Sequence, residues 1–174
     1  MNKYLIILFA IIGVLLFLVF LIFLFNIFRI KSIFKKLDVN LKRRHVLSIK
    51  YLDLIYDCFL QDQSALIAIN DVNGKLNNKL NIDEYFVLNV RLSEELQRIF
   101  DSSLNYPELK QKENFDSIHN ELLELSKSID LTRFEYNKKC KKYNKLIKKF
   151  PYKIFGLKEK KLYITKYDRF ENNY

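Results

Sequence analysis

The sequence predicts an all-α protein, in which a single N-terminal transmembrane helix is followed by an antiparallel up-down bundle of three to four long helices. Three observations lead to this fold class. The 174 residues include only three Gly and two Pro, too few for the many tight turns of a β-sandwich or barrel. An uncharged apolar run lies near the N-terminus. After it, apolar residues recur at helical spacing along most of the chain.

The apolar run "YLIILFAIIGVLLFLVFLIFLF" extends from Tyr4 to Phe25, twenty-two positions without a charge. As a helix it is about 33 Å long, enough to cross a hydrocarbon core of about 30 Å. A cleaved signal peptide has an apolar stretch of only about 7–15 residues and a small-x-small cleavage site. In this chain, bulky Phe, Ile and Leu side chains occupy the positions where the small residues of a cleavage site would be. We therefore expect residues 1–28 to be a retained, single-pass anchor in the cell membrane.

A strongly basic stretch follows the anchor and predicts its orientation. Residues 29–37 form a basic juxtamembrane segment, and more positive charges follow, with Asp38 as the single acid before His45. Positive residues near a membrane span stay on the cytoplasmic side, so we expect the N-terminus outside and the bundle in the cytoplasm. This explains the charges more simply than a nucleic-acid-binding arm does. The topology signal comprises Arg29, Lys31, Lys35, Lys36, Lys42, Arg43 and Arg44.

The bundle is expected over residues 38–150, and its first helix should continue the membrane helix with little or no break. Residues 38–70 contain no Pro or Gly and carry apolar residues at helical spacing. The stretch "NDVNGKLNNKLN", residues 70–81, then collects turn-forming residues and should end this helix. In "NIDE", Asn81 and Glu84 have the spacing of a capping box, which predicts that a second helix begins there.

The second helix should bury a stripe that begins at Ile82 and ends at Ser103, and Pro107 should interrupt the chain after it. The last long helix is expected over residues 112–149, ending before Pro151. It carries a heptad pattern of apolar residues, which is typical of a helix packed along its whole length. Lys139 interrupts this pattern. Residues 151–174 form a basic C-terminal tail that we expect to be only loosely ordered. The heptad seam is Phe115, Leu122, Ile129, Tyr136, Tyr143 and Phe150, completed by Ile118, Leu125, Thr132 and Leu146.

Two long segments resemble the LemA family. One is "LDVNLKRRHVLSIKYLDLI", residues 37–55, and the other extends from Tyr106 to Pro151. The second carries the Tyr-Pro-x-Leu-Lys turn, Glu-Asn-Phe at 113–115, Thr-Arg at 132–133, two Tyr-Asn pairs and Phe-Pro at 150–151. The resemblance implies a bacterial, single-span membrane protein with an all-α antiparallel bundle on the inner side. It implies no established biochemical activity.

The two Tyr-Asn pairs suggest a structural role. Asn137 and Asn144 are seven residues apart, and each follows a seam tyrosine, Tyr136 or Tyr143. Asn in such places can hydrogen-bond across a bundle and fix the register of its helices. The alternative is a groove that faces a partner. Together with Arg133, these four residues are the candidate interaction or register-fixing residues.

No enzymatic activity and no cofactor are predicted. The two histidines, His45 and His119, are not part of a nucleophile elbow or an H-E-x-x-H motif. Asp116 and His119 could share a helical face, but di-iron bundles need a second such pair and two more carboxylates. Cys58 and Cys140 have no metal or disulfide spacing and are expected to be small, partly buried side chains.

Charge is unevenly distributed along the predicted bundle and tail. Residues 38–130 hold 11 basic and 16 acidic residues, a net charge of −5, whereas residues 131–174 hold 14 basic and 4 acidic, a net charge of +10. The Lys-rich helix end could be solvated or could face anionic lipid, an acidic protein or nucleic acid. Nucleic acid is the least favoured of these partners, because Tyr143 falls on the heptad seam and not on a stacking surface.

The function that fits these observations best is that of an interaction or scaffold module at the inner face of the membrane. Its expected partners are membrane lipid, through the anchor, and either a membrane or membrane-adjacent protein or a second copy of the chain. The alternative is a basic C-terminal helix that binds anionic lipid or nucleic acid. No pocket chemistry is predicted, so the long helical surfaces are the candidate binding sites.

Overall fold

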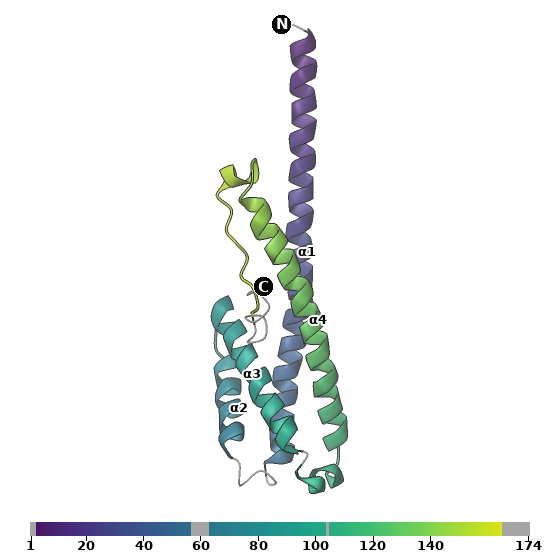
Figure 1. Ribbon diagram of the computed structural model, residues 1–174, viewed down its shortest axis with the longest axis vertical. Coiled ribbons are helices and arrows are strands. Elements are labelled where there is room, and N and C mark those ends of the chain that lie inside the picture. The colour runs from purple at the N-terminus through teal and green to yellow at the C-terminus, as the bar shows by residue number, and fades with distance from the viewer. Residues whose placement is uncertain (1–2, 57–62, 104, 165–174) are drawn as a thin grey trace, which may run out of the picture.

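The computed structural model describes residues 3–56, 63–103 and 105–164, and it confirms the all-α fold class (Figure 1). Within these ranges the chain forms four α-helices and two short 3-10 helices and contains no strand. The elements are α1 (Lys3–Ile55), α2 (Gln63–Leu76), α3 (Ile82–Ser103), η1 (Pro107–Gln111), α4 (Phe115–Ile147) and η2 (Tyr152–Phe155).

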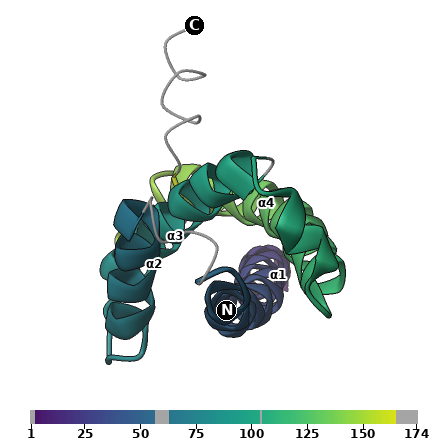
Figure 2. The same ribbon diagram turned by 90° about the horizontal axis from the view of Figure 1, so that it is seen from below.

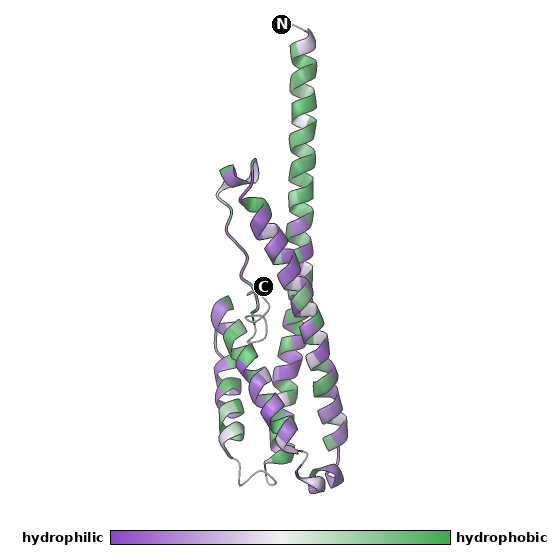
Figure 3. Cartoon of the chain, in the orientation of Figure 1, coloured by the Kyte–Doolittle hydropathy of each residue, from purple (hydrophilic) through white to green (hydrophobic). Residues whose placement is uncertain are grey.

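Helix α1 is a single unbroken element of 53 residues, as expected, and is about 80 Å long. Its first part is apolar and exposed, while its second part alternates polar and apolar side chains (Figure 3). The first part is long and apolar enough to cross a membrane by length and composition. The second part buries one face of the helix at steps of three and four. That face comprises Ile30, Ile33, Leu37, Leu41, Arg44, Ser48, Tyr51 and Ile55.

The prediction of one helix over residues 38–70 is wrong. Helix α1 ends at Ile55, where the Lys112 ammonium caps it by donating to the Leu54 carbonyl at 2.7 Å. Helix α2 then begins at Gln63 and continues through Gly74, which was expected in a turn. The fold-back lets α2 bury its apolar stripe against α3, whereas a straight helix would leave that stripe in water. The stripe is Ala65, Leu66, Ile69 and Val72.

Helix α3 begins at the predicted capping box. The Glu84 N–H donates to the Asn81 side-chain oxygen at 2.9 Å, and the Asn81 N–H donates to the Glu84 carboxylate at 3.1 Å. Two of the four N–H groups that a helix start leaves without a partner are thereby satisfied. The buried stripe of α3 also follows the prediction closely, with Asn89, Leu92, Leu96, Ile99 and Ser103 in the interior.

Helix α4 packs along α1 in the antiparallel direction, and most of its predicted seam is buried. The Asn40 amide donates to the Ser128 hydroxyl at 3.1 Å and marks the level at which the two helices meet. The seam ends before Phe150, which is exposed. Asn114, the residue before α4, has a φ of 65°, a left-handed conformation that Asn tolerates better than most residues.

Helices α2, α3 and α4 form an arc on one side of α1 (Figure 2). The chain after α4 turns at η2 and returns along the bundle as an extended segment, drawn in yellow in Figure 1. The prediction of a loosely ordered tail is therefore wrong for residues 151–164, because Tyr152 and Tyr163 are buried. Residues 165–174 lie outside the described part of the chain.

Candidate interaction site between helix α4 and the C-terminal tail

The five candidate interaction residues lie along one side of α4. The heptad pattern places Tyr136 and Tyr143 in the interior, and both are buried. Asn137, Asn144 and Arg133 lie half-buried beside them. The structure gives this side of the helix a partner that sequence reasoning missed, the extended tail of residues 157–164, which we call the strap.

Asn137 and Asn144 bind the strap through pairs of hydrogen bonds. The Asn137 amide donates to the Tyr163 carbonyl at 2.7 Å, and its oxygen accepts from the Tyr163 N–H at 2.9 Å. Asn144 makes the same pair with Lys160, at 2.9 and 2.8 Å. Each side chain thus satisfies both backbone groups of one strap residue, much as a neighbouring β-strand would. The expected bonds to another helix are replaced by bonds to the tail.

The spacing of the two asparagines matches the spacing of the two strap residues. Seven residues of α-helix rise about 10.5 Å, and three residues of extended chain span about 10 Å. The pairs Asn137–Tyr163 and Asn144–Lys160 therefore fit an antiparallel strap without strain. The repeated Tyr-Asn pair sets the register between a helix and an extended segment.

The two seam tyrosines have different neighbours. The Tyr136 hydroxyl donates to the Lys161 carbonyl at 3.0 Å, between the two Asn pairs, and burial raises the pKa of Tyr136. The Tyr143 ring stacks against Phe23 of α1, with centroids 6.0 Å apart. Because Tyr143 is buried in this way, it is not placed to stack on a nucleic-acid base.

Tyr163 anchors the end of the strap in the bundle. Its ring is almost fully buried and stacks on Phe86 of α3, with centroids 4.7 Å apart and planes 12° apart. Burial raises the pKa of the Tyr163 phenol, and the nearby Arg44 guanidinium partly offsets the effect. Ion pairs on the surface also hold the strap, Lys161 to Asp83 of α3 and Glu159 to Lys148, the residue that follows α4. The strap therefore ties α4 to α3.

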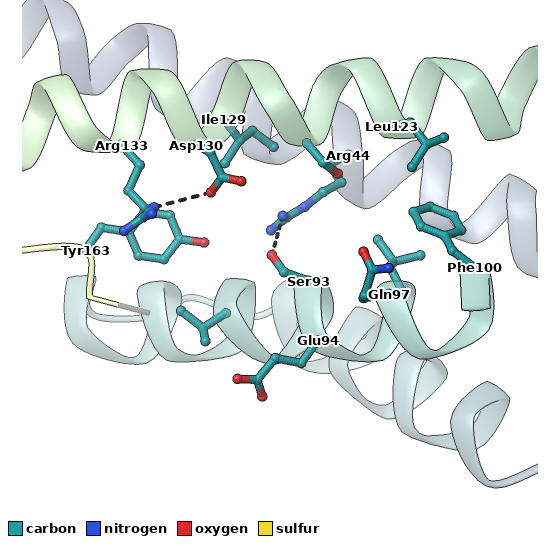
Figure 4. A pocket seen from close by; sticks show the side chains of 13 residues that line it. Arg44, Ser93, Glu94, Gln97, Phe100, Leu123, Ile129, Asp130, Arg133 and Tyr163 are labelled. Atoms are coloured by element: carbon teal, nitrogen blue, oxygen red, sulfur yellow. Dashed lines mark hydrogen bonds and ion pairs between the residues drawn. The ribbon is translucent and has the colours of Figure 1, made fainter. Parts of the chain in front are cut away.

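A cavity of about 260 Å³ lies beside Tyr163 and is lined by α1, α3 and α4 (Figure 4). Arg133 points toward it and pairs with Asp130, its Nε lying 3.4 Å from the carboxylate. Arg44 reaches into the same space from α1. The lining thus includes two guanidinium groups, the carboxylates of Asp130 and Glu94, and a phenol.

Arg44 differs from the other basic residues of the predicted topology signal, because it is buried. It was assigned to the topology signal, yet its side chain is 1% exposed and binds α3. Its guanidinium donates to the Ser93 hydroxyl at 2.5 Å, and to the backbone and side-chain oxygens of Asn89 at 2.8 and 3.2 Å. Its Nε has no hydrogen-bond partner among the described residues. In the folded protein, Arg44 is a buried tie between helices.

The other basic residues of the predicted topology signal lie on the outside of α1. Lys42 pairs with Asp38 at 2.7 Å, and Arg43 pairs with Glu121 of α4 at 2.5 Å. About 25 Å of helix separates Phe25 from Lys42, so Lys42 and Arg43 lie far from the end of the apolar run. The four nearer ones, which are exposed, are Arg29, Lys31, Lys35 and Lys36.

The two histidines are engaged in local contacts. Nδ1 of His119 lies 2.9 Å from the Tyr51 hydroxyl, and His45 donates from Nε2 to the Asn73 carbonyl at 3.2 Å. Burial lowers the pKa of both imidazoles. Cys140 is a buried free thiol, and burial raises its pKa; Cys58 lies outside the described residues. Within those residues, no group of His, Cys, Asp and Glu side chains could hold a metal ion.

Comparison with known protein families identifies the chain. The sequence model of the LemA family matches residues 33–172. The chain belongs to the LemA family. LemA is not a known enzyme family, and no curated protein matches the chain. The LemA match begins in the second part of α1 and includes the strap, so helix bundle and strap lie within one family region.

Three residues central to this site were missed from the sequence, namely Lys160, Tyr163 and the buried Arg44. The strap carries a weak signal, the apolar "LYI" at 162–164 in an otherwise polar tail. A short β-prone run of this kind fits a half-buried extended segment. Arg44 also carries a signal, since it lies three residues after Leu41 and four before Ser48 on the buried stripe of α1, but the basic residues around it obscure this.

Proposed function

We propose that this LemA protein is a membrane-anchored, non-enzymatic interaction module. Its first helix crosses the membrane with the N-terminus outside, and its bundle stands in the cytoplasm and binds a second membrane protein. The observation that carries the proposal is the continuity of α1 from an exposed apolar run into the bundle core. A helix without a break transmits a fixed orientation, so the bundle is held rigidly relative to the membrane.

The face of α1 opposite the arc is the best candidate for the binding surface. It carries two strongly exposed apolar side chains, Val39 and Val46, which are 56% and 54% exposed, and beside them lies Ile49, which borders α2. Their steps of seven and three are those of a coiled-coil seam. We call these three residues the α1 seam. A partner helix lying along it would run roughly parallel to α1, as a neighbouring membrane-anchored helix would.

The charges beside the α1 seam indicate the chemistry of the partner. Five exposed basic residues flank it, Lys35, Lys36, Lys42, Arg43 and Lys50, of which Lys42 and Arg43 also pair with acids of the same chain. Two copies of this chain in one membrane would pair their seams in parallel and bring these charges together, which opposes self-association. We infer that the partner presents a helix with apolar residues at heptad spacing and acidic residues on either side.

Site-specific photocrosslinking in intact cells tests this proposal. A photoreactive residue replaces Val46 in the α1 seam, and a matched control replaces Val87, an exposed apolar residue on α3. We expect Val46, but not Val87, to crosslink one defined membrane protein. In the same cells, the bundle should resist a protease added from outside, because the membrane encloses it.

Three results would overturn the proposal in different ways. Digestion of the bundle by a protease added from outside would show that the bundle lies outside the cell, the opposite of the proposed orientation. Homodimers crosslinked through Val46 would show that the partner is a second copy of this chain and not a protein with an acidic helix. Equal labelling at Val46 and Val87 would show that the α1 seam is no preferred binding surface.

A further inference from the structure

The turn between α4 and the strap carries exposed apolar side chains at the membrane-facing end of the bundle. We call residues 148–156 the tip. Phe150 and Ile154 are 82% and 72% exposed, more than any other large apolar side chains described in the bundle apart from Leu131. Three exposed lysines, Lys148, Lys149 and Lys153, lie among them. Apolar side chains interleaved with lysines are typical of segments that lie in a membrane interface.

The tip is held against the apolar part of α1. The Tyr152 hydroxyl donates to the Val19 carbonyl at 3.2 Å, and the Tyr152 ring lies 5.6 Å from that of Phe23. Both Val19 and Phe23 belong to the uncharged run that ends at Phe25. The tip therefore lies beside the last two turns of the apolar run, as the position of η2 in Figure 1 also shows.

The length of the apolar run decides whether the tip can remain outside a bilayer. If the hydrocarbon ended before Val19, the span would be Tyr4–Leu18, fifteen residues and about 22 Å. A hydrocarbon core is about 30 Å thick. The run must therefore be used to about Phe25, and Val19 then lies about 9 Å inside its end. Interfacial helices bury their apolar faces about 5–10 Å deep, so the two depths agree.

We propose that the tip inserts into the cytoplasmic leaflet beside α1, so that the protein holds the bilayer at a second point. This inference rests on the proposed membrane span. Phe150 and Ile154 enter the upper part of the acyl layer, while Tyr152 faces α1 at the level of Val19 and Phe23. Lys148, Lys149 and Lys153 extend back toward the lipid phosphates, as lysines near an interface do.

The surrounding charge favours an anionic leaflet. The last turns of α4 carry four more exposed lysines, at positions 138, 141, 142 and 145, and lie at the level where α1 leaves its apolar run. These lysines would lie among headgroups if the tip is inserted. Contact with anionic headgroups would thereby give a role to the lysines at the end of α4, which do not contribute to the bundle core.

Both ends of the tip are fixed by the fold, so insertion needs no rearrangement. On one side α4 packs on α1, and on the other the Asn144–Lys160 pair holds the strap. Gly156 makes the reversal between them with a φ of 57°, in the left-handed region that glycine adopts without steric cost. A tip with fixed ends keeps its depth relative to α1.

Tryptophan fluorescence of the full chain in lipid vesicles tests the insertion, because the protein has no Trp of its own. Phe150→Trp and Ile154→Trp place a reporter in the tip. Val87→Trp is the matched control, exposed on α3 far from the apolar run, and Phe9→Trp reports on the span itself. The vesicles contain phosphatidylcholine and phosphatidylglycerol, with a spin-label quencher attached either near the top or near the end of the acyl chain.

We expect both tip reporters to have blue-shifted emission and to lose more than half of their fluorescence to the upper quencher, while Val87→Trp is unaffected. Quenching of Phe9→Trp together with tip reporters that behave like Val87→Trp would overturn the inserted tip and leave the span intact. Absence of quenching at Phe9→Trp would instead overturn the proposed span, and the insertion with it. Circular dichroism checks that each variant remains helical.

Discussion

At the scale of single residues, the two strap-binding asparagines show why the side-chain amide is suited to its place. An Asn side chain carries one acceptor oxygen and an N–H donor group, the same pair of functions as a peptide unit. It can therefore satisfy both polar groups of a backbone that approaches a helix from the side. Backbone groups of the half-buried strap would otherwise be costly to bury.

Removing either asparagine should loosen the strap without disturbing the helices. Asn137→Ala and Asn144→Ala each remove two hydrogen bonds, about 2 kcal/mol together. We expect the amide N–H groups of Tyr163 and Lys160, respectively, to exchange with solvent about 30-fold faster. Hydrogen exchange followed by mass spectrometry measures this, with Asn120→Ala, an exposed residue of α4, as the control. Unchanged exchange in both variants would show that the asparagines do not hold the strap.

At the scale of elements, α1 is fixed to the rest of the bundle in two ways. The buried face of α1 packs against α4 over a long antiparallel contact, and Arg44 connects α1 to α3. Removing the buried guanidinium would leave the Ser93 hydroxyl oxygen and the Asn89 side-chain oxygen without their Arg44 donor, which is more costly than losing an exposed ion pair. Adjacent basic residues in the sequence therefore contribute very differently to the free energy of unfolding.

Arg44 and Arg43 allow a direct comparison of these contributions to stability. Arg44→Ala should lower the free energy of unfolding by about 3 kcal/mol, because it opens a cavity and leaves buried acceptors unsatisfied. Arg43→Ala removes a largely exposed pair with Glu121 and should cost less than about 1 kcal/mol. Chemical denaturation of the two variants in detergent measures both values. Equal losses would contradict the assignment of Arg44 as a buried tie.

At the scale of the whole molecule, the fold should lose stability as the pH falls below neutral. Burial lowers the pKa of His119 and His45 below the ordinary value of 6.5, although Asp116 partly offsets the effect at His119. The unfolded chain therefore takes up protons first as the pH falls through 6.5, and stability declines toward the lower pKa values of the folded state. Above about pH 6.5 this contribution is fully present.

A pair of neutral substitutions isolates the histidines from the carboxylates. His45→Gln and His119→Asn retain a polar group near the ring nitrogen that makes each contact, Nε2 in His45 and Nδ1 in His119. We expect thermal unfolding midpoints of the unmodified chain to fall between pH 7 and pH 5.5, and those of the double variant to change less. The same slope in both proteins would assign the pH dependence to other groups.

Much of this fold could be predicted because its determinants are local. The capping box at Asn81 and Glu84 acts within one turn of helix. The seam of α4 follows from periodicity, and its buried tyrosines and leucines lie where that periodicity places them. The candidate site was predicted in part, since the Tyr-Asn pairs were recognised as special but were given the wrong partner.

The sequence by itself determined the helical class, the apolar run, the main seam and the family, because periodicity, hydropathy and capping act between neighbours along the chain. Only the tertiary structure decided where α1 ends, that Arg44 is buried, and that the strap pairs with Asn137 and Asn144. These features depend on residues far apart in sequence, and burial against them overrides local propensity. Residues 38–70 favour helix throughout, yet α2 folds back because its apolar stripe has a lower free energy when it is buried against α3 than when it is exposed to water.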